Sequence, residues 1–154
     1  MYREQIDRYF DLHKDEIVEN IKRLVRIPSV ARPDLAQEGA PFGPVCRQAV
    51  DEAQKIASEL GLKSRILDGY VIEIDMNEQT PEVGILAHLD VVPEGDGWDT
   101  DPYDPQVRDG YIFGRGADDN KGPAVISLYA MKAAMEINPA LQKGCRTILG
   151  SAEE

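Results

Sequence analysis

Apolar positions along the chain recur at the spacing of an α-helix in three separate stretches. The first covers residues 3 to about 26 and ends before Pro28, because the residue ahead of a proline disfavours helical backbone. The second begins at Pro44, a favoured first-turn residue, and ends before a Gly61 cap. The third covers residues 123 to about 137 and is apolar on most of its faces, so we expect it to be buried.

Short β-prone runs separated by turn residues predict strands between and after these helices. The runs are residues 65–67, 71–75, 83–87, 111–113 and 146–150. The run 83–87, VGILA, is continuously apolar, which is typical of a strand buried on both faces. Helices that alternate with strands predict a layered α/β domain.

The composition limits the classes of protein that the chain can represent. Its 154 residues are 42% hydrophobic and 29% charged, the balance of one globular domain. A formal net charge of −11 argues against a nucleic-acid partner, because affinity for phosphates comes from Lys and Arg.

Two cysteines without CxxC spacing predict buried free thiols and a reducing cytoplasm. The N-terminus lacks the apolar core of a signal peptide, and no run approaches the ~18 apolar residues of a membrane span, so we expect a cytoplasmic protein.

Candidate chemistry lies at the ends of the predicted strands, where ligands gather in layered α/β sheets. Three pairs of residues occupy such positions: His88 with Asp90, Asp118 with Asp119, and Glu153 with Glu154. One imidazole among carboxylates, without a thiolate, suits zinc, manganese or cobalt. Each pair alone has an ordinary explanation as a chance match, a turn or solvated charge. Together they are more specific, because their residue types complement one another as metal ligands and a base.

Other sites are disfavoured by the same sequence. GRGADDNKG lacks the third glycine of a dinucleotide fingerprint and the Gly-Lys-Ser/Thr of a P-loop, and no GxSxG is present. The segment 99–104 lacks the glycine and distal glutamate of a calcium loop, so the acids from Glu94 to Asp104 are predicted to form a surface loop without ligands. His13 shares a helical stripe with Phe10 and Ile17, which favours a partly buried helix residue over a ligand.

Five segments, HLDVVPEGDGW, DPYDP, GRGADDNKGP, SAEE and the early RLVRIPSV, resemble in order and spacing the co-catalytic dizinc amidohydrolases. These include aminoacylases, glutamate carboxypeptidases, succinyl-diaminopimelate desuccinylases and bacterial dipeptidases, and the chain looks closest to the dipeptidase branch. The resemblance implies a zinc-exopeptidase-like catalytic domain, with a mixed α/β sheet sandwiched by helices.

The resemblance also implies a role for each candidate residue. His88 looks like a ligand of one metal, and Asp90 like the carboxylate that orients the imidazole. Asp119 looks like the carboxylate that bridges two Zn²⁺ ions, for which Mn²⁺ or Co²⁺ could substitute. Glu153 resembles the general base and Glu154 a ligand of the second metal. The order within this pair of glutamates comes entirely from the family pattern.

The family carries a further aspartate and histidine downstream, and a smaller lid domain, which this sequence lacks. We therefore interpret residues 1–154 as the N-terminal portion of an incomplete catalytic domain and expect it to be inactive alone. The predicted function is metal-dependent hydrolysis of the amide bond in dipeptides or small peptides. An N-acyl amino acid deacylase and a non-catalytic scaffold relative are the alternatives, and the intact candidate residues weigh against the scaffold. Nothing in the sequence indicates the oligomeric state.

Overall fold

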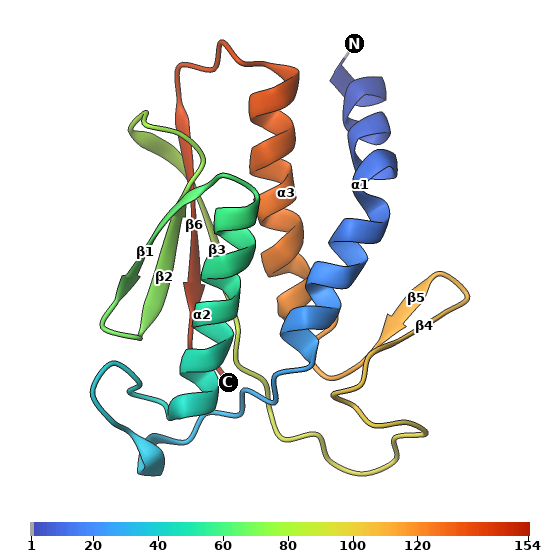
Figure 1. Ribbon diagram of the computed structural model, residues 1–154, viewed down its shortest axis with the longest axis vertical. Coiled ribbons are helices and arrows are strands. Elements are labelled where there is room, and N and C mark those ends of the chain that lie inside the picture. The colour runs from blue at the N-terminus through green and yellow to red at the C-terminus, as the bar shows by residue number, and fades with distance from the viewer. Residues whose placement is uncertain (1) are drawn as a thin grey trace.

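The computed structural model describes residues 2–154, which form three α-helices, a four-stranded sheet and a two-stranded hairpin (Figure 1). The helices are α1 (Tyr2–Val25), α2 (Pro44–Glu59) and α3 (Lys121–Ile137), and a short 3-10 helix spans Pro33–Leu35. The strands are β1 (Lys63–Leu67), β2 (Val71–Asp75), β3 (Pro81–His88), β4 (Gln106–Arg108), β5 (Tyr111–Phe113) and β6 (Gly144–Gly150). All of the predicted helices and strands are present, and β4 was not predicted. It is a three-residue strand that pairs with β5 and leaves little periodicity to detect.

The main sheet is mixed and has the strand order β1-β2-β6-β3. β1 and β2 pair antiparallel as a hairpin, and β2 also pairs antiparallel with β6. β3 and β6 are parallel, and α3 lies in the connection between them. Such a crossover brings the carboxyl ends of two parallel strands to the same edge of the sheet.

The core lies between the sheet and the helices, which stand on one side of it (Figure 1). Ile74 on β2 and Thr147 on β6 are register partners, and both side chains are buried toward the helices. Thr147 Oγ1 donates to Ser127 Oγ of α3 at 3.3 Å. Asn20 of α1 donates to the Tyr129 hydroxyl of α3 at 2.8 Å, which joins the two helices in the core. The mixed α/β class and the burial of α3 are confirmed.

The prediction that VGILA is buried on both faces is wrong for this chain. β3 is an edge strand within the described residues, and Leu86 is 79% exposed. Helix α3 contacts β3, and the alternation of side chains along the strand turns Leu86 to the opposite face from Ala87, where it remains in contact with solvent. A continuous apolar run shows that a strand can be buried on both faces, but the cover has to come from other elements.

The structure also places the two cysteines and His13. Cys46 is buried, Cys145 is half-buried, and both are free thiols. His13 is partly exposed on α1, stacks 4.4 Å from the Tyr9 ring and pairs with Glu16. Between Tyr2 and Glu154 no helix has the length and apolar character needed to cross a membrane.

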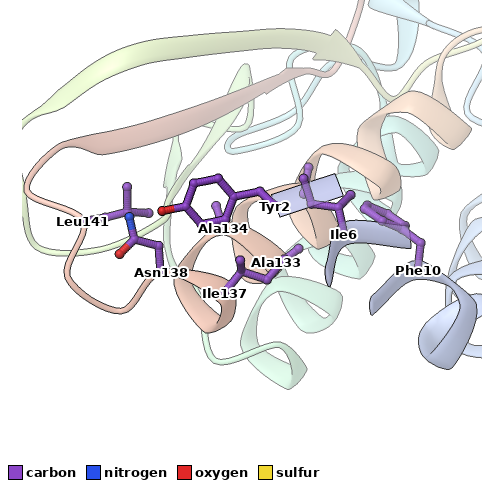
Figure 2. A pocket seen from close by; sticks show the side chains of 9 residues that line it. Tyr2, Ile6, Phe10, Ala133, Ala134, Ile137, Asn138 and Leu141 are labelled. Carbon is purple, nitrogen blue, oxygen red and sulfur yellow. The ribbon is translucent and has the colours of Figure 1, made fainter. Parts of the chain in front are cut away.

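An apolar pocket of about 320 Å³ opens between the start of α1 and the end of α3 (Figure 2). Its walls include Ile6 and Phe10 on α1 and Ile137 on α3, and no imidazole or carboxylate lines it. The pocket therefore offers neither a metal ligand nor a base. It also lies at the opposite end of α3 from Asp119, one of the candidate metal ligands.

Candidate metal centre

The carboxyl ends of β3 and β6 deliver two of the three predicted pairs to one edge of the sheet. β3 ends at His88, and β6 ends at Gly150 directly beside it. The backbone N–H of Leu89 donates to the Gly150 carbonyl at 2.9 Å, so the ladder continues past the end of β3. The third pair arrives with the loop that leads into α3, since Asp119 lies two residues before the start of that helix.

His88, Asp119 and Glu154 meet at this edge. Each offers one potential ligand atom, and these three atoms lie within 4.8 Å of one another. His88 Nε2 lies 3.1 Å from Asp119 Oδ1. His88 is buried, whereas Glu154 is exposed and the Asp119 side chain is 73% exposed, so the imidazole forms the floor of an open site. Zinc bonds of about 2 Å to nitrogen and oxygen would let a cation lie between two such atoms.

Asp90 lies behind His88 and is fully buried. Its backbone carbonyl accepts from His88 Nδ1 at 3.2 Å, and its Oδ1 lies 3.3 Å from the same nitrogen without reaching hydrogen-bond geometry. Two acceptors beside Nδ1 favour the proton on that nitrogen, which leaves the lone pair of Nε2 free for a cation. Asp90 is therefore placed to fix the tautomer of His88.

The same carboxylate also holds the glutamate pair. Asp90 Oδ2 accepts the backbone N–H groups of Glu153 at 2.8 Å and Glu154 at 3.0 Å. These bonds set the backbone of both residues relative to His88, while both side chains stay exposed. The ligand group contains Glu154 and not Glu153, so the two neighbours present their carboxylates differently.

The remaining acids of the region lie outside this group. Asp118 is exposed next to Asp119 and is not a member. The acids from Glu94 to Asp104 are also outside it, and they lie in an exposed loop. Part of this loop is held by its own side chains, since Tyr103 donates to Glu94 Oε2 at 3.1 Å.

Sequence analysis missed two buried polar residues beside the site, Ser29 and Lys121. Ser29 Oγ donates to the Leu89 carbonyl at 2.6 Å, and Lys121 Nζ donates to the Ile27 carbonyl at 2.7 Å. Burial lowers the pKa of Lys121 to about 7. The sequence placed Lys121 in the loop before the helix predicted from residue 123, whereas the structure makes it the first residue of α3. Ser29 left no signal in the sequence.

Cys46 lies close to the same segment, with its Sγ 3.5 Å from the Ser29 carbonyl. Burial, and to a lesser degree the negative charge of Asp90, raises the pKa of this thiol to about 11. Cys46 is therefore protonated at neutral pH and is not an activated nucleophile.

Comparison with known proteins shows which family the chain is similar to. Residues 84–154 match the sequence profile described as "Peptidase family M20/M25/M40", and this range includes His88, Asp90, Asp119 and both terminal glutamates. The chain is therefore similar to this peptidase family. A provisionally named dipeptidase of Staphylococcus saprophyticus is 40% identical over 154 residues, all of this chain and 32% of the relative. Another, YtjP of Bacillus subtilis, is 36% identical over 141 residues, 92% of this chain and 30% of the relative.

Solved structures show the same fold. Human carnosine dipeptidase 1 superposes with a TM-score of 0.75 at 30% identity, over 97% of this chain and 34% of its own. The dipeptidase Dug1p of Saccharomyces cerevisiae superposes with a TM-score of 0.76 at 19% identity, over 95% of this chain and 34% of its own. The chain therefore spans about a third of the length of these relatives and contains part of their peptidase fold.

Proposed function

We propose that this chain carries part of the active site of a dipeptidase that hydrolyses an amide bond with a metal-activated water. The observation that carries the proposal is the meeting of His88, Asp119 and Glu154 within 4.8 Å at the carboxyl edge of the sheet. The match to a peptidase family supports peptide hydrolysis, and several relatives are named as dipeptidases. A dipeptide substrate, zinc as the metal and a cytoplasmic location belong to the same proposal.

The donor set fits a pair of cations. His88 Nε2 would hold one ion, Glu154 the other, and the exposed Asp119 carboxylate has two oxygens with which to bridge them. Two bound zinc, manganese or cobalt ions would lower the pKa of a shared water and polarise the amide carbonyl of the substrate. Asp90 would keep the proton on Nδ1 of His88, so that Nε2 stays available.

Glu153 is proposed as the general base. Its backbone N–H is fixed by Asp90, and its carboxylate is exposed and outside the ligand group. A carboxylate in this position is free to take a proton from water held beside Glu154. It could then pass that proton to the leaving amine.

Residues 1–154 are proposed to supply the first part of the catalytic domain. If Asp119 is shared, His88 and Glu154 leave each ion with two side-chain ligands, whereas a catalytic zinc usually has three. The remaining ligands, and the groups that recognise the substrate, would come from residues beyond this chain. This ligand count is the reason to test activity in the full-length protein.

The test is a comparison of dipeptides with N-acyl amino acids as substrates of the full-length protein, with added zinc, manganese or cobalt. We expect metal-dependent hydrolysis of dipeptides, and we expect His88→Ala to lose it together with bound metal. Asp99→Asn, in the exposed acidic loop, is the matched control and should behave as the wild type. Preference for N-acyl amino acids would identify a deacylase, and no hydrolysis of any substrate with any of the added metals would favour the scaffold.

A further inference from the structure

The peptide groups on both sides of Asp90 are held by one residue from the loop after α1. Ser29 is fully buried, and its hydroxyl donates to the Leu89 carbonyl at 2.6 Å. Its own carbonyl accepts the Val91 N–H at 3.1 Å. Ser29 therefore fixes the backbone immediately before and after Asp90, at the point where the chain leaves β3 and the regular ladder ends.

The loop that carries Asp119 is attached to the same segment. Lys121 is fully buried, and its Nζ reaches across the core to the Ile27 carbonyl at 2.7 Å. Its backbone N–H donates to the Gly116 carbonyl at 3.0 Å, so both ends of the loop around Asp119 are fixed through one residue. A side chain at Gly116 would come within 3.2 Å of Lys121 Cδ, which shows how closely the lysine stem packs under the loop.

The segment 27–29 thus joins the loops on which the site depends. Lys121 connects the Asp119 loop to Ile27. Two residues further along the same segment, Ser29 is bonded to the backbone on both sides of Asp90. Asp90 in turn holds the backbone of the glutamate pair. The Asp119 side chain is 73% exposed, so its position relative to His88 depends on the backbone that carries it. Metal affinity depends steeply on such distances.

We propose that Ser29 and Lys121 are positioning residues that hold the His88 and Asp119 loops at metal-binding distance through the segment 27–29. The inference rests on the proposed metal site but assigns it two residues that bind no metal. Because they fix the backbone of the two loops, substituting them should lower the zinc affinity, whereas a buried residue elsewhere should lower only the thermal stability. Residues that orient metal ligands typically change metal affinity by about 10- to 100-fold when mutated.

The decisive experiment measures zinc affinity in the full-length protein by competition with a chromophoric chelator, beside thermal unfolding of the metal-free form. Ser29→Ala and Lys121→Met should lower zinc affinity at least about tenfold. Ser127→Ala is the matched control, because Ser127 is also buried and also donates to a backbone carbonyl at 2.6 Å, but within α3. Ser29→Ala and Ser127→Ala should lower the Tm by similar amounts, while only the first weakens zinc binding.

The visible absorption of bound cobalt(II) provides a second readout, since it reports ligand geometry and not overall stability. It should change in Ser29→Ala and Lys121→Met and stay unchanged in Ser127→Ala. Ser29→Cys, with a weak donor of similar size, should restore part of the affinity. If Ser29→Ala does not fold, the comparison of Lys121→Met with the control decides.

The two proposals fail in different ways. Wild-type zinc affinity in Ser29→Ala and Lys121→Met, with zinc lost in His88→Ala, would overturn the positioning role and leave the metal site standing. Unchanged zinc affinity in His88→Ala would overturn both.

Discussion

Asp90 Oδ2 accepts the backbone N–H of Glu154 at 3.0 Å, although 64 residues separate the two in the chain. The bond crosses from the end of β3 to the end of β6. It uses one oxygen of a carboxylate whose other oxygen faces the His88 ring at 3.3 Å. A single buried side chain therefore couples the orientation of the imidazole to the position of the terminal glutamates, and this coupling makes Asp90 the sharpest place to test the site.

Asp90→Asn should lower zinc affinity by about 10- to 100-fold. The backbone N–H groups of Glu153 and Glu154 require an acceptor, so the amide oxygen should remain at the Oδ2 position and the amide NH₂ should face His88. The negative oxygen beside Nδ1 would then be lost, which leaves only the Asp90 backbone carbonyl to hold the proton on Nδ1 and weakens the preference for the tautomer that frees Nε2 for a cation. Zinc titration of the full-length protein checks this, with Asp99→Asn as the control, and an unchanged affinity would contradict the assigned tautomer.

The two terminal glutamates should respond differently to the same substitution. Glu153→Gln should abolish most turnover and leave metal content near that of the wild type, because an amide keeps the shape but cannot take a proton from water. Glu154→Gln should instead lose metal, since its carboxylate belongs to the ligand group. Activity and metal analysis of the two purified full-length variants decide, and the reverse pattern would exchange the two roles.

The 154-residue chain alone should bind zinc weakly and show no peptidase activity. His88, Asp119 and Glu154 are three side chains to be divided between two ions. Hydrolysis of dipeptides and N-acyl amino acids with added zinc, manganese or cobalt should therefore be absent from the short chain and present in the full-length protein. Comparable metal-dependent rates in both would refute the incomplete ligand set.

The exposure of β3 can be tested by truncating two leucines of the sheet in the 154-residue chain. Leu149 is fully buried on β6, so Leu149→Ala should lower the free energy of unfolding by about 2–5 kcal/mol. Leu86 is 79% exposed on β3, and Leu86→Ala should change it by no more than about 0.5 kcal/mol. Urea unfolding gives both values, and an equal loss in the two variants would show that β3 is covered in solution.

The elements of the fold followed from local patterns in the sequence. Helix periodicity predicted all three helices because each buries one stripe or most of its surface against the core. The end of the strand at His88 and the loop before α3 could be read from the change from apolar residues to polar and turn residues. The candidate site residues were named from these positions together with the family resemblance, and the sequence by itself left the order of the two terminal glutamates to that resemblance.

Relationships between distant segments were decided only by the tertiary structure. VGILA reads as a doubly buried strand, yet its exposure depends on which elements cover it, and the described chain covers one face. The mixed pairing of β6, parallel to β3 and antiparallel to β2, likewise joins segments far apart in the chain. The bond of Ser29 to Leu89 spans 60 residues and that of Lys121 to Ile27 spans 94. No local pattern encodes such contacts, because burial makes a polar group take whichever backbone partner the packed fold brings within reach.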